Sequence, residues 1–448
     1  MLKLKNIMKK LLTLGLIGII GISAIACDSG GDSESETSQE ASESSQEAAE
    51  NLVEEGTSEE VASESTDEEV AETVTLKIAA RGGSHVDAIN AVKEEFENEH
   101  NVVIEVSGYE NPDLKTNIML DSTKSVSDFD LVMLDDPWMP EITEASILLN
   151  LTEQGVEADS DFIEAGVKLG QDPYAEGDLY ALPYSGNVMM YFYNTDLVAD
   201  APSSWAEVLE DAKTVSADGK FGYVIRGQQG NPIVSDWLPI FWANGGEVFN
   251  EDWTASVNTP EAIEALELYM ELLENGANYE KNDLVAAVSD GNGAASLGWP
   301  SWYVTSEGAS AAYATIPGKF TADGEEYPAG MIGNWMIGVM ANTDQPELAT
   351  QLVEFLTSAE SQIEGAKVGG VPTRTSVLNN EEVVAANPHF PILAKSMENA
   401  KARPRTALWG ACEEALGAEL SAAISGVKTA SEALDDATEA LDTIIQGG

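Results

Sequence analysis

The stretch Asp128-Phe-Asp-Leu-Val-Met-Leu-Asp-Asp-Pro-Trp-Met-Pro-Glu141 decides the fold that this sequence predicts. Its centre, residues 131–134, is wholly apolar, which is typical of a strand covered on both faces in a parallel sheet. The apolar run stops abruptly at Asp135 and Asp136, with Trp138 close behind. Because ligands of open α/β sheets bind beyond the carboxyl ends of the strands, these three residues are candidates for a binding site.

The two strand-end aspartates have two interpretations. Side chains alternate along a strand, so Asp135 and Asp136 are expected to point to different sides. A carboxylate that faces a crevice accepts hydrogen bonds from sugar hydroxyls, and the indole of Trp138 can cover an apolar sugar face. Alternatively, both carboxylates cap a helix predicted over residues 137–145, and Trp138 fills the core.

The segments before this strand extend an α/β pattern. Residues 75–80 alternate as a strand and lead through Arg81 and a Gly-Gly pair into a helix. Residues 102–106 predict a second strand and residues 111–121 a second helix, so parallel strands with right-handed crossovers are expected. Arg81 is a candidate cleft residue because a guanidinium donates two parallel hydrogen bonds, and a surface ion pair is the alternative.

Later helices are marked by end signals. Thr259 and Pro260 predict a helix start, and the Asn-Gly pair at 275–276 predicts its end. Residues 202–213 and 404–445 are also predicted to be helical. The predicted buried face of the helix that begins at Pro260 consists of Ile263, Leu266, Met270 and Leu273.

The charge balance argues against nucleic acid as a partner. The 448 residues include 78 acidic and 22 basic residues, which gives a net charge of −56. Seventeen of the acids lie in residues 28–74, which contain no lysine or arginine, and residues 75–448 hold 61 acidic against 18 basic residues. Such a surface repels phosphate backbones, so nucleic acid is not an expected partner.

The N-terminus predicts export and a lipid anchor. Four lysines precede an apolar segment that ends in Ala24-Ile25-Ala26-Cys27, which resembles a bacterial lipoprotein signal with Cys27 as the lipidated residue. An uncleaved anchor or an ordinary secretory signal is the alternative. Residues 1–27 are therefore interpreted as a signal peptide, and residues 28–74, rich in Ser, Glu and Ala, as a disordered acidic linker. The expected location is extracytoplasmic, at the cell membrane.

The tryptophans predict a carbohydrate site. Most of the nine tryptophans lie near the ends of predicted elements or beside Gly or Pro, where core packing is less typical, although packing remains the alternative for any single one. Indole faces combined with a few Asp, Asn and Arg side chains suit a sugar. The tryptophans in such positions are Trp138, Trp237, Trp242, Trp299, Trp302, Trp335 and Trp409.

Little in the sequence supports catalysis or a cofactor. A glycosidase needs two carboxylates roughly 5–10 Å apart across the scissile bond, and the adjacent Asp135 and Asp136 cannot straddle one. The three histidines, His85, His100 and His389, lack the spacing of a zinc site. We therefore expect a binding protein rather than an enzyme, with no cofactor and no metal.

Seven short motifs, in this order, carry a family resemblance: Asp128-Phe-Asp-Leu-Val132, Tyr180-Ala-Leu-Pro183, Tyr191-Phe-Tyr-Asn194, Ala243-Asn-Gly-Gly246, Asn258-Thr-Pro-Glu-Ala262, Gly298-Trp-Pro300 and Ala402-Arg-Pro-Arg405. Together they resemble the extracellular solute-binding proteins of ATP-binding-cassette (ABC) importers, in the sugar-binding branch related to maltose-binding protein. The resemblance covers residues 75–448.

The resemblance implies an α/β, two-lobed periplasmic-binding-protein-like fold of type II, with a hinge and a ligand cleft between the lobes. The first lobe is expected to contain residues 75–185 and 308–342. The second lobe is expected to contain residues 186–307 and 343–448.

The resemblance also assigns roles to individual residues. It places the family's strand-end acid at Asp135 or Asp136. Asn187 falls at a position where maltose binders carry an acid, so the resemblance does not identify the sugar as maltose. The aromatic residues that stack on sugars in this family fall near Trp299, Trp302 and Trp409. Trp335 and Arg374 lie on loops that commonly face the cleft. The complete predicted ligand-binding set is Arg81, Asp135, Asp136, Trp138, Asn187, Trp237, Trp299, Trp302, Trp335, Arg374 and Trp409.

The expected function is that of a monomeric, lipid-anchored receptor that delivers a mono- or oligosaccharide to an ABC permease. One alternative keeps the fold and binds a polyamine or another small cation, because carboxylates and aromatic faces also suit positive charge. A surface carbohydrate-active enzyme is the remaining alternative.

Overall fold

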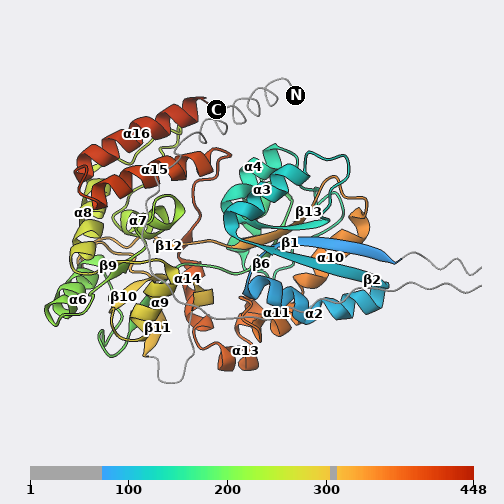
Figure 1. Cartoon of the computed structure of the whole chain (residues 1–448), viewed down its shortest axis with the longest axis horizontal. Helices are drawn as coiled ribbons and strands as arrows, with labels where there is room; N and C mark the ends of the chain where they lie inside the picture. The colour runs from blue at the N-terminus through green and yellow to red at the C-terminus, as the bar shows by residue number, and fades with distance from the viewer. Residues whose placement is uncertain (1–72, 303–309, 448) are drawn as a thin grey trace, which may run out of the picture. The chain divides into compact units, whose positions relative to one another are not determined.

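The computed structural model describes residues 73–302 and 310–447 of the chain (Figure 1). The predicted signal peptide with Cys27, and the predicted linker up to residue 72, lie outside the described residues. Within the described part of the chain, no helix has the length and apolar character needed to cross a membrane.

A five-stranded sheet with the order β2-β1-β3-β13-β6 organises the first part of the fold. β1 (Val74–Arg81), β2 (Val102–Tyr109) and β3 (Leu131–Asp135) are parallel, as predicted. β13 (Trp335–Val339) runs antiparallel to β3 and to β6 (Leu182–Ser185). The apolar residues of β3 are fully buried, which confirms that both of its faces are covered.

Helices cover both faces of this sheet. α2 (Ser84–His100) follows β1 and α3 (Asn111–Asp121) follows β2, and Figure 1 shows them on opposite sides of the strands. α10 (Pro346–Leu356) and α11 (Ala359–Ala366) pack beside α2, and α10 also contacts β13. The predicted division assigned residues 343–448 to the second lobe, so the packing of α10 differs from that division.

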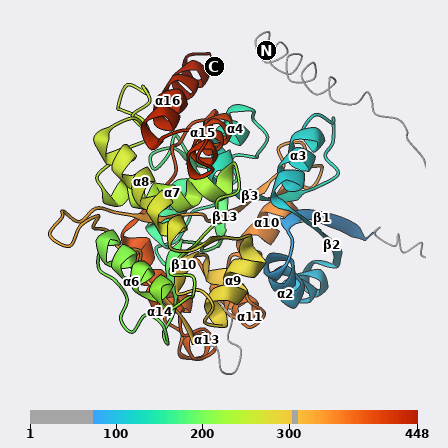
Figure 2. The same ribbon diagram turned by 60° about the vertical axis from the view of Figure 1, so that its left-hand side comes forward.

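A smaller antiparallel sheet with the order β10-β7-β11 organises the second part. Helices surround it, and Figure 2 brings α6, α8 and α9 forward, with α16 above them. The sheet strands are β7 (Met190–Asn194), β10 (Ala295–Gly298) and β11 (Ala311–Ala314). The larger helices are α6 (Trp205–Ala217), α7 (Asn231–Ala243), α8 (Pro260–Glu274), α9 (Lys281–Ser289), α14 (Phe390–Glu398), α15 (Trp409–Ile424) and α16 (Ala430–Gly447).

Shorter elements complete the fold. Two of them, η1 (Asp136–Trp138) and α4 (Met139–Glu144), stand where a single helix over residues 137–145 was predicted. The others are α5 (Glu164–Leu169), β4 (Gln171–Asp172), β5 (Asp178–Leu179), β8 (Val224–Ile225), β9 (Ala277–Asn278), η2 (Pro300–Trp302), β12 (Gly330–Met331), α12 (Thr375–Leu378), α13 (Glu381–Ala386) and β14 (Ala400–Lys401).

α8 and α6 test the predicted helix boundaries. The Thr259 hydroxyl accepts a hydrogen bond from the Ala262 N–H at 3.3 Å, which confirms the predicted cap of α8. The predicted start of a helix at residue 202 is wrong, because Ser204 caps α6 and the helix begins at Trp205. Of the predicted buried face of α8, Leu266 is fully buried, and Ile263, Met270 and Leu273 are partly buried and pack against the core. The buried residues of the helix are Ala262, Ala265, Leu266, Leu268, Tyr269 and Leu272.

The chain passes between the two parts at segments that bond to one another. The Asn187 N–H donates to Asn334 Oδ1 at 2.8 Å, and the Gly333 N–H donates to the Asn187 carbonyl oxygen at 2.8 Å. The Ile332 N–H donates to the Lys401 carbonyl oxygen at 3.0 Å. Residues from three distant stretches of sequence therefore lie side by side where the first sheet meets the second part.

Candidate ligand-binding site

A polar pocket of about 380 Å³ lies at this junction. That volume falls within the range of roughly 300–1,000 Å³ that is usual for small-molecule sites. Both parts of the fold contribute side chains to the pocket. Its lining consists of Arg81, Gly82, Gly83, Ser84, His85, Asn111, Asp135, Ser185, Asn187, Asn231, Lys281, Trp299, Ser301, Trp302, Gly333, Trp335 and Arg403.

Strand ends and helix starts position these side chains. Arg81 ends β1 and Asp135 ends β3, so both project from the carboxyl edge of the parallel strands. Asn111, Asn231 and Lys281 are the first residues of α3, α7 and α9. Gly83 precedes α2 with φ of 83°, a left-handed conformation that favours glycine, and this turn directs the start of α2 at the pocket.

The pocket brings together six of the predicted ligand-binding residues. They come from five separate stretches of sequence, and three of them are tryptophans. The six residues are Arg81, Asp135, Asn187, Trp299, Trp302 and Trp335.

Five predicted residues do not line the pocket. Trp237 and Trp409 are packed in the core of the second part, and Trp237 stacks on Phe241 with ring centroids 4.7 Å apart. Trp138 is buried behind Trp335, and Asp136 is fully buried. Arg374 has a structural role, because its Nε donates to the Thr357 carbonyl oxygen at 2.7 Å and its Nη1 bonds both oxygens of Asp159. These five side chains are engaged in packing or in ion pairs.

Asp135 and Asp136 differ in their access to the pocket, although both bond to the same guanidinium nitrogen of Arg403. Asp135 borders the pocket and accepts hydrogen bonds from Asn111 Nδ2 at 3.2 Å and Arg403 Nη2 at 3.0 Å. Asp136 does not line the pocket, and it accepts from the same Arg403 Nη2 at 3.1 Å and from Arg405 Nη1 at 3.2 Å. Asp135 stands at the N-cap position of η1 without a side-chain cap bond, so its carboxylate is not a helix cap. Burial raises the pKa of Asp136, and the charge of Arg403 opposes that rise.

Arg81 and Lys281 form a positively charged corner of the pocket beside His85. Arg81 Nη2 pairs with Glu110 at 2.6 Å, so the ion-pair interpretation and the cleft interpretation of Arg81 are both observed. Burial and the charge of Arg81 lower the pKa of Lys281. The same causes, in the same order, lower the pKa of His85 to about 4. His85 is therefore neutral at pH 7.

The pocket tryptophans are held in different ways. Trp335 makes edge contacts with His85 and Trp138, with ring centroids 5.5 Å and 5.9 Å away. Trp299 lies so close to Gly333 that a Cβ at that position would come within 2.6 Å of the indole. Lys281 Nζ lies 5.6 Å from the centroid of the Trp302 ring, so this indole makes a cation–π contact and also borders the pocket.

Sequence reasoning missed several lining residues. Arg403 belongs to the Ala402-Arg-Pro-Arg405 motif, but no pattern indicates that it reaches Asp135 across more than two hundred residues of sequence. Sequence reasoning could have found three of them, because each is the first residue of a helix and helix starts were identified from the sequence. These residues are Asn111, Asn231 and Lys281. His85 was considered only as a metal ligand, and its place beside the Gly-Gly turn could have identified it.

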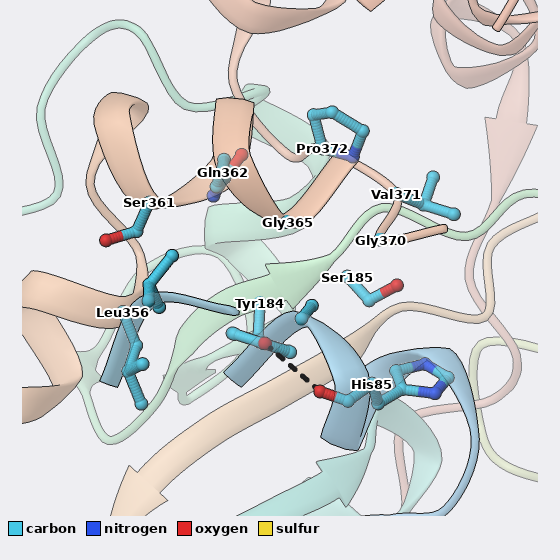
Figure 3. A pocket seen from close by; sticks show the side chains of 12 residues that line it. His85, Tyr184, Ser185, Leu356, Ser361, Gln362, Gly365, Gly370, Val371 and Pro372 are labelled. Atoms are coloured by element: carbon cyan, nitrogen blue, oxygen red, sulfur yellow. Dashed lines mark hydrogen bonds between the residues drawn. The ribbon is translucent and has the colours of Figure 1, made fainter. Parts of the chain in front are cut away.

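A second, much smaller cavity of about 20 Å³ adjoins the pocket and shares His85 and Ser185 with it (Figure 3). Figure 3 shows the Tyr184 hydroxyl directed at the carbonyl oxygen of His85, to which it donates at 3.3 Å. A cavity of this size holds about one water molecule. The larger pocket is therefore the one that a small-molecule ligand can enter.

A metal centre has no support in residues 73–302 and 310–447, where no group of three or more His, Cys, Asp or Glu side chains could hold an ion. Direct hydrogen bonding and aromatic contact are the chemistry that the pocket offers. An α/β fold of two lobes with a polar and aromatic pocket between them defines a small-molecule binding protein.

The family follows from comparison of the sequence. A model of the bacterial extracellular solute-binding protein family matches residues 91–392, and the chain belongs to this family. One relative is a "Probable ABC transporter-binding protein" of Deinococcus radiodurans, 27% identical over 338 residues, which are 70% of this chain and 79% of the relative. A second, from Sinorhizobium fredii, is named a probable amino-acid ABC transporter periplasmic-binding protein and is 21% identical over 387 residues, 81% of this chain and 87% of the relative.

Solved structures share the fold. Maltose-bound T. maritima MalE3 is 24% identical with a TM-score of 0.72, and the match covers 82% of this chain and 99% of that one. A solute-binding protein from Agrobacterium radiobacter in complex with ribitol is 21% identical with a TM-score of 0.73, covering 83% and 98%. The predicted family and the predicted two-lobed α/β fold are both confirmed.

Proposed function

We propose that this protein is the substrate-binding component of an ABC importer, and that it captures a sugar outside the cytoplasmic membrane and delivers it to the permease. The observation that carries the proposal is the junction pocket, where Trp299 and Trp335 stand among hydrogen-bonding side chains. The names of the relatives support the ABC transporter, and the bound maltose and ribitol of the solved structures support a sugar or polyol ligand.

The pocket chemistry suits sugar hydroxyls. Asp135 accepts hydrogen bonds, and Asn111 and Asn231 offer both donors and acceptors. Asn187 Oδ1 is buried without a hydrogen-bond partner among the described residues, so a ligand hydroxyl would satisfy it. A few charged hydrogen bonds of roughly 1.5–3 kcal/mol each, reduced by the entropy lost on binding, lead to an affinity on the order of micromolar.

Ligand capture requires the two lobes to move. We propose hinge bending at the bonded segments around Asn187, Gly333 and Lys401, because they connect the lobes beside the pocket. The first lobe would then be residues 75–185 together with a later segment, and the packing of α10 against β13 supports extending that segment past residue 342. The second lobe would hold most of residues 186–307 and the C-terminal helices.

Two further features complete the proposal. A lipid on Cys27 would hold the protein at the membrane, which mass spectrometry of the membrane-extracted N-terminus would test. The protein would act as a monomer. The protein would perform no bond chemistry, because Asp135 is the single carboxylate among the pocket-lining residues that the structure describes, whereas glycosidases use two.

Calorimetry against a panel of sugars and polyols tests the proposal. At least one sugar should bind, and Trp299→Ala should weaken it about tenfold or more, because an indole face is lost. Trp253→Ala is the matched control, since that tryptophan is 41% exposed and lies outside the pocket. Failure of every sugar to bind would refute the proposal, and unchanged affinity in Trp299→Ala would refute the site. The polyamine alternative is not favoured, because Arg81, Lys281 and Arg403 line the pocket.

A further inference from the structure

The pocket differs in charge from the rest of the molecule. Residues 75–448 hold more than three acidic residues for each basic one. The pocket lining reverses this ratio, with Arg81, Lys281 and Arg403 against the single carboxylate of Asp135. Two of these cations have carboxylate partners, since Arg81 pairs with Glu110 and Arg403 pairs with Asp135 and Asp136. The charge that can attract a negatively charged ligand is therefore mainly that of Lys281.

Lys281 is the most informative of these cations. Among the residues that the structure describes, no carboxylate oxygen lies within 4 Å of its Nζ, in contrast to the pairs Arg81–Glu110 and Arg403–Asp135. Its contact is the Trp302 ring, which cannot neutralise the charge. Lys281 therefore presents an unpaired positive charge at the pocket.

Arg81 and Lys281 come from opposite parts of the fold. Arg81 ends β1 of the first sheet, and Lys281 begins α9, which packs against β7 and β10 of the second part. Their mutual repulsion lowers the pKa of Lys281, after the larger effect of burial. Glu110, which pairs with Arg81 and opposes the fall in the pKa of Lys281, offsets part of this repulsion. An anion bound between Arg81 and Lys281 would offset the rest, so its binding would also favour closure.

Two further groups favour an anion at the same place. α2 begins beside the pocket with Gly83 as its N-cap and no side-chain cap, so its first N–H groups and the positive end of its dipole face the pocket. Arg403 is only 3% exposed, and its Nε has no hydrogen-bond partner among the described residues. Asp135 and Asp136 bond to Nη2 of Arg403 and offset part of its charge, and the Nε group remains free to donate to an anion.

We propose that the ligand of this pocket is an acidic sugar, whose carboxylate lies between Arg81, Lys281 and the start of α2 and whose hydroxyls reach Asp135 and the pocket amides. This inference rests on the proposed function and specifies the class of sugar. The tryptophans supply an apolar surface for the ring, as they would for a neutral sugar.

Calorimetry with matched ligand pairs tests the inference on the full mature chain. Glucuronate, galacturonate and gluconate are compared with glucose, galactose and glucitol, at low and at high salt. At least one acid should bind about tenfold or more tightly than its neutral partner, because a charged hydrogen bond is gained, and added salt should weaken only the acid. Glucose 6-phosphate, glutamate and spermidine complete the panel.

Lys281→Met should remove most of the preference for the acid, with a loss of about ten- to hundredfold. Lys213→Met is the matched control, because that lysine pairs with Glu271 at 2.6 Å and does not line the pocket, and it should change nothing. Neutral sugars that bind as tightly as their acids would overturn this inference and leave the proposed function intact. Selective binding of glucose 6-phosphate would overturn the specificity for a carboxylate, and with it this inference, but not the proposed function. Selective binding of glutamate or spermidine, or no binding of any sugar, would overturn both the proposed function and this inference.

Discussion

Replacement of Asp136 by asparagine separates a structural role from a ligand-binding role. Asp136 was expected to bind ligand, but its side chain is 0% exposed and bonds Arg403 and Arg405. Arg405 also donates to the Asp136 carbonyl oxygen at 2.7 Å and to the Leu169 carbonyl oxygen at 3.0 Å. The carboxylate thus fastens the segment before α15 to the end of the first sheet.

The expected cost of Asp136→Asn is large. The substitution keeps the shape of the side chain but removes its negative charge. Among the described residues, the buried Arg403 then keeps only Asp135 as a carboxylate within 4 Å, and the largely buried Arg405 keeps none. Removing one partner of a buried ion pair costs about 3–5 kcal/mol. That is a large part of the roughly 5–15 kcal/mol by which a typical domain is stable. Affinity should fall less, because Arg403 keeps its bond to Asp135.

Urea unfolding, followed by both tryptophan fluorescence and circular dichroism, measures this cost where the two transitions coincide. Glu164→Gln is the control, since that carboxylate is 82% exposed in its pair with Lys168, and its loss should leave the unfolding midpoint unchanged. A loss below about 1 kcal/mol in Asp136→Asn would refute the buried-anchor argument. Abolished ligand binding with wild-type stability would restore Asp136 to the ligand-binding residues.

Two more predictions address the pocket. The pKa of His85 is lowered from 6.5 to about 4, so the folded state prefers the neutral imidazole. The free energy of unfolding should therefore fall as the pH drops from 6.5 towards 4, by up to about 3 kcal/mol. His85→Asn should flatten this part of the pH profile, and an identical profile would contradict the assignment. Gly333→Ala should weaken ligand binding about tenfold, because the new Cβ would press on Trp299 at 2.6 Å. Gly330→Ala, whose Cβ would meet only contacts of 3.4 Å or more, should bind normally, and equal affinity in both variants would contradict this role of Gly333.

The sequence predicted those features that depend on local chemistry. The burial of β3, the parallel crossovers and the Thr259 cap follow from apolar runs and capping residues, and all are observed. The buried face of α8 was shifted, because small residues such as Ala262 and Ala265 pack inward while the larger Ile263 is only partly buried. Residue size alone does not identify the face that meets α7 and α16.

The site was predicted in part for a similar reason. Asp135 and Arg81 end neighbouring parallel strands, and topology alone brings such ends to one edge. Trp409 begins α15 but is buried in the second part, and Trp237, which was expected near the end of an element, lies in the middle of α7 and is buried there as well. Whether a tryptophan is exposed or buried at such an end depends on contacts distant in sequence, which no local pattern encodes.

The charge of the pocket is a consequence of that long-range geometry. Arg403 and Asp135 are far apart in sequence and adjacent in the fold, so the aspartate that was expected to bind a ligand is already paired with a cation. Lys281, which no motif singled out, has no such carboxylate within 4 Å among the described residues and gives the pocket its free charge. Because pairing decides which charges remain available to a ligand, the acidic composition of the chain and the positive character of its pocket are compatible. The specificity of this receptor should therefore depend on Lys281 and Arg81 more than on Asp135.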